Sequence, residues 1–193
     1  MGLDSVELLM DIENFFEIRI PNKEAEKIAT IQDMVDTVAH HLNITANEKT
    51  LRDKVFKQIL PHILQLSNKE IQPGLNDLIA DYLDVSDKAK WLTLEKLVQM
   101  SLPIPALTNY TSSKSWFKKY VSRANNYDWK EITVEQFIDA VCANNYQKLI
   151  DPAAVKSKYE IYICVMRITV DKAGVDYYEI LPHKSFTSDL GID

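Results

Sequence analysis

Glycine and cysteine are both scarce in this sequence. Only four glycines occur among 193 residues, and neither GxGxxG nor GxxxxGK[ST] is present, so a glycine-rich nucleotide loop is excluded. The two cysteines, Cys142 and Cys164, provide neither a disulfide framework nor the spacing of a zinc site. A reducing compartment, and hence a cytoplasmic location, is expected.

Long hydrophobic runs are also missing. No apolar run reaches the roughly 18 residues that a membrane helix needs. Asp4, Glu7 and Asp11 interrupt the only apolar stretch near the start, which is unlike a signal peptide. We therefore expect no membrane association. With 46% hydrophobic and 26% charged residues, the composition is that of a folded globular chain.

The net charge of -6 is unevenly distributed along the sequence. Residues 1–44 carry nine acids against three bases, whereas residues 45–156 carry 13 acids and 15 bases. Binding of nucleic acid requires a basic face, so the acidic first segment predicts no nucleic-acid partner. It suits basic protein surfaces, or an internal contact with the chain's own mildly basic middle.

Segment 4–16, DSVELLMDIENFF, predicts a helix that Asp4 or Ser5 can cap. A second helix is predicted after Thr30. The expected buried side of the first helix consists of apolar residues at helical spacing: Val6, Leu9, Met10 and Phe16.

The middle of the sequence also has helical periodicity. Pro61 is expected to break or kink one of its helices. Thr93 and Thr133 precede the strings TLEKLVQM and TVEQFIDAV, which are similar to TIQDMVDTV after Thr30. Either these are ordinary capped amphipathic helices, or the chain contains an ancient repeat.

Segment 159–170, YEIYICVMRITV, fits a strand by composition and a helix by length and spacing. No partner strand is evident elsewhere in the sequence, so we expect a helix that is buried on more than one side. The fold class expected for the whole chain is all-α.

Segment 3–42 contains the strings VELLM, I-P, EAEKI and T-x-Q-D in that order, and segment 157–193 contains GVDYYEILPHKSFTSDLGID. With these strings both ends of the chain resemble the acyl carrier protein family, a small four-helix bundle. Segment 3–42 is similar to the family's second, third and fourth helices, and segment 157–193 to its first helix and following loop.

The resemblance implies a circular permutation, because the family's first helix comes last here. We expect residues 1–44 and 157–193 to form one acyl-carrier-like four-helix bundle, with residues 45–156 as a helical middle subdomain. Neither end alone can bury its apolar face. The protein is therefore expected to pair its ends within a monomer or between the chains of a swapped homodimer.

In this family a serine in an Asp-Ser-Leu string carries a 4′-phosphopantetheine arm. Asp4-Ser5-Val6 resembles that string and makes Ser5 the candidate cofactor-binding residue. Ser5 precedes Pro21 by 16 residues, about one helical turn less than the family's spacing. An ungapped match places Gly2 at the attachment position, and Ser5 is then an ordinary N-terminal helical residue.

The resemblance implies a carrier and not an enzyme. With the arm, which a phosphopantetheinyl transferase attaches, the protein would carry acyl groups for fatty acid or secondary metabolite synthesis. Without the arm it would be an adaptor that acts as a protein-interaction module. In either case the acids of the first helix would meet basic surfaces of acyl-transfer or synthase enzymes: Asp4, Glu7, Asp11 and Glu13.

No catalytic or metal-binding constellation is recognisable in the sequence. His40 and His41 end a predicted helix, where a protonated histidine favours the C-terminal dipole, and Cys164 is expected to be a buried thiol. The basic stretch 114–123, KSWFKKYVSR, is either a solvated face, a coenzyme or phosphate site, or a dock for the acidic helix.

Overall fold

A computed structural model describes residues 3–105 and 129–192. Over these residues the chain is helical and contains no β-strand, which confirms the all-α prediction. None of the helices described is long and apolar enough to cross a bilayer. The predicted basic stretch 114–123 lies outside the described residues. The chain divides into two compact units: an end unit of residues 1–49 and 146–193, and a middle unit of residues 50–145.

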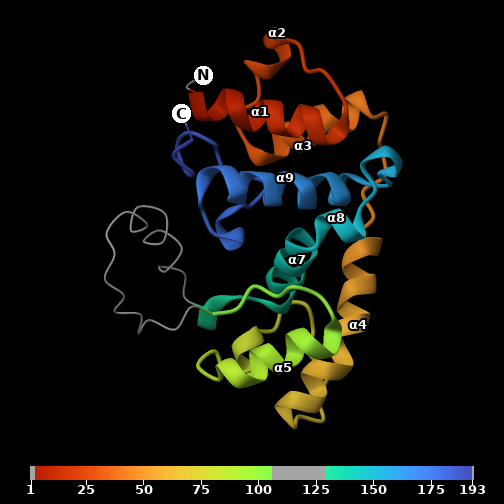
Figure 1. The fold of residues 1–193 in the computed structure, drawn as a ribbon, viewed down its shortest axis with the longest axis vertical. Helices are drawn as coiled ribbons and strands as arrows, with labels where there is room; N and C mark the ends of the chain where they lie inside the picture. The colour runs from red at the N-terminus through yellow and green to blue at the C-terminus, as the bar shows by residue number, and fades with distance from the viewer. Residues whose placement is uncertain (1–2, 106–128, 193) are drawn as a thin grey trace. The chain divides into compact units, whose positions relative to one another are not determined.

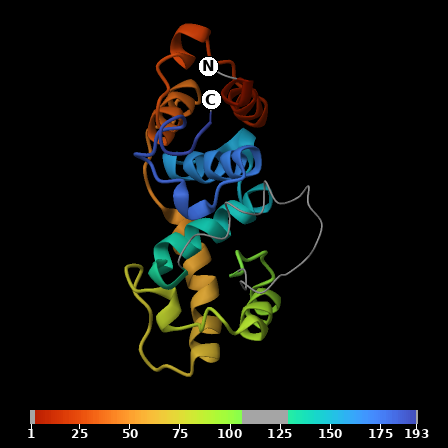
Figure 2. The ribbon, with the colours of Figure 1, turned by 90° about the vertical axis from the view of Figure 1, so that its left-hand side faces the viewer.

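The end unit is built from both ends of the chain. Helix α9, the last in the sequence, packs on both α1 and α3 (Figure 1). The start of α1 and the last described residues lie side by side in both views (Figures 1 and 2). The helices of this unit are α1 (Leu3–Phe16), α2 (Asn22–Ala25), α3 (Ile31–His41), α8 (Tyr146–Leu149) and α9 (Lys158–Ala173), with short 3₁₀ turns η3 (Pro152–Ala154) and η4 (Tyr177–Glu179).

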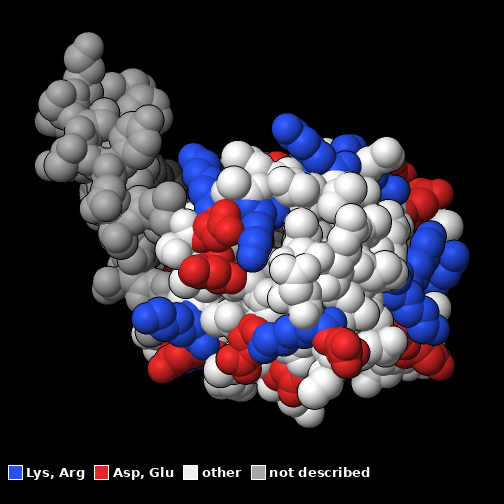
Figure 3. Space-filling model, turned by 90° about the horizontal axis from the view of Figure 1, so that it is seen from below, with Lys and Arg blue, Asp and Glu red and all other residues white. Residues whose placement is uncertain are grey.

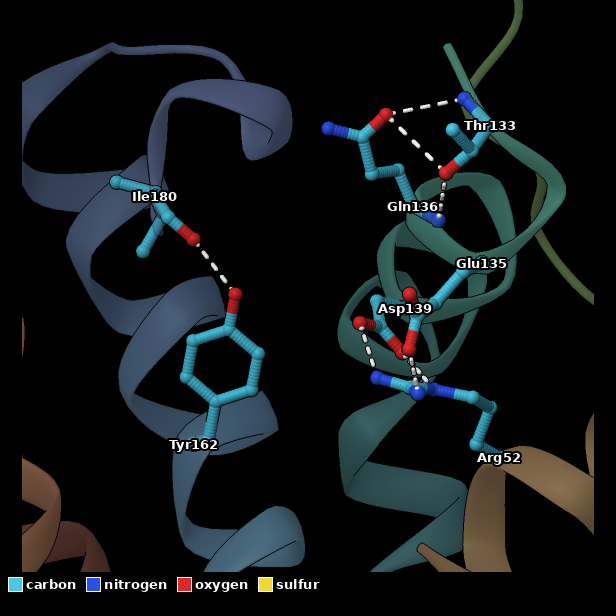
Figure 4. A network of polar contacts seen from close by, with 7 residues as sticks. All are labelled: Arg52, Thr133, Glu135, Gln136, Asp139, Tyr162 and Ile180. Carbon is cyan, nitrogen blue, oxygen red and sulfur yellow. Dashed lines mark hydrogen bonds and ion pairs between the residues drawn. The ribbon is translucent and has the colours of Figure 1, made fainter. Parts of the chain in front are cut away.

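Helix α9 confirms the helical interpretation of segment 159–170. The Ser157 side chain caps its start by accepting the Glu160 N–H, and Gly174 ends it in the left-handed conformation at φ 62°. The Tyr162 hydroxyl donates a hydrogen bond of 2.7 Å to the Ile180 carbonyl in the following loop (Figure 4). The buried residues of α9 are Tyr159, Ile161, Ile163, Cys164, Val165, Met166, Ile168 and Thr169. They cover several sides of the helix, as expected for a central element.

Thr30 caps α3, as predicted. Its hydroxyl accepts the Asp33 N–H, while the Asp33 carboxylate accepts the Thr30 N–H, so the two residues form a capping box. The same threonine forms an isolated antiparallel bridge with Ser185. The loop after α9 is thereby tied to the start of α3.

Helix α1 buries only part of the side predicted. Phe16 is buried as predicted and Leu9 is half-buried, whereas Val6 is 39% and Met10 is 52% exposed. The residues buried with Phe16 are Leu8 and Ile12, so the predicted burial of Val6 and Met10 was wrong. Residues at a spacing of four share a helix face. The Leu8 row continues through two further apolar residues, while the Val6 row continues from Met10 into the polar Asn14.

The middle unit packs its first helix against two others. Helix α4 contacts both α5 and α7. Trp91 and Phe137 are fully buried, with ring centroids 5.6 Å apart in an edge-to-face contact. The helices are α4 (Thr50–Ser67), α5 (Lys88–Val98) and α7 (Val134–Asn144), with 3₁₀ turns η1 (Ile79–Asp81) and η2 (Trp129–Glu131).

Pro61 does not break α4, which runs through this residue without ending. Ile59 and Ile63 on either side are fully buried and hold the helix in place. Thr93 lies inside α5, where its hydroxyl donates to the Ala89 carbonyl at 2.8 Å. The N-cap of α5 is Asp87, which accepts the N–H of Lys90.

A buried ion pair joins α4 to α7. The guanidinium of Arg52 donates two hydrogen bonds of 2.7 Å to the carboxylate of Asp139, and Arg52 also pairs with Glu135 (Figure 4). Arg52 and Asp139 are both buried. The two oppositely charged groups offset each other's cost of leaving water.

Candidate functional site

The candidate attachment residue lies in the first turn of α1. Helix α1 begins at Leu3, so Ser5 is its third residue, and its side chain is half-buried, while Asp4 is exposed. The N–H groups of a first helical turn have no intrahelical acceptor and favour negative charge nearby. A phosphate on Ser5 would lie in a favourable field.

Two of the predicted partner-binding acids lie side by side on the exposed face of α1. The Lys172 ammonium on α9 lies 3.1 Å from a Glu7 oxygen and 3.0 Å from an Asp11 oxygen. Hydrogen bonds with Asp11 and Glu7 raise the pKa of Lys172. This lysine holds the two carboxylates at one place and tethers α1 to α9.

Glu13 does not share that surface. It is 7% exposed, and its carboxylate accepts a hydrogen bond of 2.6 Å from the Ile20 N–H. Arg19 lies 3.6 Å from its other oxygen. Glu13 therefore fastens the chain segment after α1 and presents no free carboxylate to a partner.

Apolar side chains lie between the exposed acids. Val6 and Met10 are exposed on the same side of α1 as Glu7 and Asp11. We call the residues Asp4, Val6, Glu7, Met10 and Asp11 the α1 face. A surface of this kind combines apolar contact area with negative charge, and it matches a partner with apolar and basic side chains.

A groove of about 540 Å³ adjoins the α1 face in the end unit. Phe15 on α1 and Tyr146 at the start of α8 stand with ring centroids 5.1 Å apart, and both line the groove. Asp11 and Lys172 also line it. The groove places an aromatic wall next to the acidic surface.

The remaining candidates have structural roles. His41 contacts Glu24 at 2.9 Å and thereby joins α3 to α2. Cys164 is buried, as predicted, and burial raises its pKa well above the ordinary value, which keeps it an unreactive thiol. Among the residues described, no group of three His, Cys, Asp or Glu side chains is placed to hold a metal ion.

Sequence reasoning missed Lys172, because it lies 165 residues from Glu7 and no local pattern links them. The Arg52–Asp139 pair was missed for the same reason, since 87 residues separate its members. One signal could have indicated a buried ion pair. Arg52 lies next to the apolar stripe of Leu51 and Val55, where a charged residue is buried only if it is paired.

Comparison with known proteins gives a partial similarity. The chain is 50% identical over 37 residues to the acyl carrier proteins of Chlorobium phaeobacteroides, Chlorobium phaeovibrioides and Chlorobium luteolum. The matched part is 19% of this chain and 47% of each relative, so the chain spans about half the length of the curated relatives it matches. No family model and no solved structure matches the chain.

Proposed function

We propose that the end unit is a circularly permuted acyl-carrier-like module. In this proposal it carries acyl groups on a 4′-phosphopantetheine arm for fatty acid or secondary metabolite synthesis, in the cytoplasm and without catalysing a reaction itself. The observation that carries the proposal is the packing of α9 on both α1 and α3. That packing brings together the two segments that resemble the family.

The arrangement of the chain ends supports the permutation. A carrier whose ends lie close together can be cut in one loop and joined elsewhere without losing its packing. The bridge between Thr30 and Ser185 joins the two segments away from the helices as well. The domain limits 1–44 with 157–193, and 45–156 for the middle subdomain, are part of this proposal.

Ser5 is the residue proposed to hold the arm. It offers a primary hydroxyl, it is partly exposed, and the first turn of α1 favours a phosphate there. The arm would supply a thiol that carries the acyl group as a thioester. The chain's own contribution is to anchor the phosphate at Ser5 Oγ and to keep α1 rigid through the burial of Leu8 and Ile12.

The α1 face is proposed to dock the enzymes that load and unload the arm. Asp4, Glu7 and Asp11 suit basic residues of a phosphopantetheinyl transferase, an acyl transferase or a synthase. Val6 and Met10 supply the apolar contact. Glu13 has no part in this docking, since its carboxylate is buried against the backbone.

An adaptor without the arm is the second candidate. The half-burial of Ser5 inside the helix favours it, as does the ungapped match that places Gly2 at the attachment position. In that case the same α1 face would bind partner enzymes, and no acyl group would be carried.

Mass spectrometry of the intact protein separates the two candidates. The full chain is incubated with coenzyme A and a broad-specificity phosphopantetheinyl transferase, with a known carrier as positive control. We expect the mass of one arm to be added, and Ser5→Ala to abolish the gain. Ser86→Ala is the matched control, because Ser86 is an exposed serine directly before the N-cap of α5.

Absence of any mass gain would leave the adaptor as the function of the end unit. A gain that survives Ser5→Ala, or that Ser86→Ala abolishes, would contradict Ser5 as the attachment residue.

A further inference from the structure

One set of backbone hydrogen bonds fixes the start of α3 to the loop after α9. The Thr30 bridge to Ser185 lies at its centre. Three N–H groups donate around it: Ile31 to Lys184 (3.0 Å), Gln32 to Pro182 (2.8 Å) and Phe186 to Ala29 (3.0 Å).

The same set occurs in the middle unit, between the start of α7 and the loop after α4. Thr133 forms the isolated bridge there, with Leu78. Three N–H groups again donate around it: Val134 to Asp77 (2.8 Å), Glu135 to Leu75 (2.8 Å) and Ile79 to Ile132 (2.9 Å). Each residue of this set at the start of α7 comes 103 positions after its counterpart at the start of α3. Each residue of the set in the loop after α4 comes 107 positions before its counterpart in the loop after α9.

Side chains near the two bridges repeat as well. Thr30 and Thr133 both form capping boxes, with Asp33 and Gln136 respectively. About two turns into each capped helix, an aspartate forms an ion pair with a basic residue. That basic residue lies in the first turn of the helix that packs against the capped helix. Asp36 pairs with Lys158 at 2.6 Å, and Asp139 pairs with Arg52 at 2.7 Å.

The helices correspond as well. Helix α9 packs on α1 and α3, and α4 packs on α5 and α7. Helix α4 therefore corresponds to α9, α7 to α3, and α5 to α1. Constant offsets across a whole hydrogen-bond network are the signature of an internal repeat, so the resemblance between the strings after Thr30 and Thr133 reflects a shared structure.

The two corresponding helices α1 and α5 carry opposite charge. Helix α1 contains four acids and no base, whereas α5 contains three lysines and one glutamate. Leu92 and Leu97 are 38% and 39% exposed on α5, and Lys88 and Lys96 are exposed with them. We call these four residues the α5 face. In the part of the chain that the structure describes, neither Lys88 nor Lys96 forms an ion pair.

One side of the molecule shows no broad patch of a single charge. On the side of the molecule seen from below, basic and acidic side chains lie in small mixed groups with uncharged atoms between them (Figure 3). On that side, a charged partner would therefore meet small local groups of charge and no extended patch of one sign.

We propose that the middle unit is a second copy of the bundle, and that its α5 face docks the α1 face of a second copy of this chain. The two faces are complementary, because each has two exposed apolar side chains and they carry opposite charge. The lysines of the α5 face would meet Asp4 together with Glu7 and Asp11, which also share Lys172. The contact joins two different faces, the α5 face of one chain and the α1 face of another.

Sedimentation velocity on the full chain, without coenzyme A, tests this proposal. We expect the average size to grow with protein concentration, and high salt to reduce the growth because it screens the charged contacts. Lys88→Glu with Lys96→Glu should raise the concentration of half-association by about tenfold. Lys54→Glu with Lys57→Glu, on the exposed side of α4, makes the same charge change and should leave it unaltered.

Charge reversal on the α1 face allows a second test, in which two variants are mixed. Asp4→Lys with Glu7→Lys should also weaken self-association, and mixing this variant with Lys88→Glu/Lys96→Glu should restore it. Circular dichroism confirms that each variant is folded. A chain that stays monomeric at all concentrations overturns the proposal, as does a dimer that is indifferent to salt and to both reversals, or a mixture without rescue.

Discussion

At the residue scale, the capping boxes of Thr30 and Thr133 differ in one respect. The Asp33 carboxylate accepts the N–H groups of Thr30 (2.9 Å) and Ala29 (3.1 Å), whereas the box of Thr133 uses the neutral Gln136. Burial works to raise the pKa of Asp33, but the hydrogen bonds from Thr30 and Ala29 outweigh it and hold the pKa below the ordinary 3.8. Asp33 therefore stabilises the fold above its unfolded pKa and loses this effect as the pH falls through its folded pKa.

Asp33→Ala should lower the free energy of unfolding by about 1 kcal/mol at neutral pH, and by less near pH 3. Gln136→Ala should cost a similar amount at both pH values, because an amide does not titrate. Urea unfolding followed by circular dichroism at each pH measures the difference. Equal pH dependence of the two variants would contradict the role given to the Asp33 carboxylate.

A second prediction at the residue scale concerns the stability contributed by the buried pair of Arg52 and Asp139. Arg52→Met leaves the Asp139 carboxylate buried without its main partner, so we expect a loss of about 3–5 kcal/mol in unfolding free energy. The double variant Arg52→Met/Asp139→Leu removes both charges and should recover much of that loss. Lys54→Met, at an exposed position of the same helix, is the control and should change stability by less than about 0.5 kcal/mol.

At the scale of elements, the face that α1 buries in the structure differs from the face predicted from the sequence. Leu8→Ala and Ile12→Ala create cavities in the core and should each cost about 2–5 kcal/mol. Met10→Ala should be nearly neutral for stability, because its side chain is half exposed. Thermal or urea unfolding of the three variants measures this. A large loss for Met10→Ala with small losses for the other two would support the face predicted from the sequence.

Local sequence signals predicted where helices form. Long-range contacts decide which faces of those helices are buried. Thr30 and Thr133 are polar caps directly before apolar periodic segments, and each caps a helix in the structure. The face that α1 buries is not local information, since apolar residues lie on more than one side of it. Continuation of α4 through Pro61 likewise depends on what Ile59 and Ile63 pack against.

The candidate site was predictable only in part. Asp4, Glu7 and Asp11 are exposed on α1, where an acidic docking helix needs them, but Glu13 turned inward to meet the Ile20 N–H. That hydrogen bond depends on the path of the chain after the helix, which sequence periodicity does not specify. Whether the exposed acids bind a partner stays a prediction.

At the scale of the whole molecule, the end unit depends on segments that are far apart in sequence. Residues 1–49 alone would expose Leu8, Ile12 and Phe16 to water, because α9 is missing. We therefore expect the isolated segment 1–49 to be unfolded, with little helical signal. A chain in which residues 146–193 are followed, through a short Gly/Ser linker, by residues 1–49 should instead restore the carrier-like order of helices.

This rejoined chain should be helical, unfold cooperatively and sediment as a monomer, because the start of α1 and the last described residues lie side by side (Figure 2). Comparison with the full chain also tests the swapped homodimer. If swapping occurs, the full chain forms a salt-insensitive dimer while the rejoined chain is monomeric, since its linker holds both segments in one molecule. A rejoined chain without cooperative unfolding would contradict the circular permutation itself, because the same apolar faces would then fail to pack when connected in the family's order.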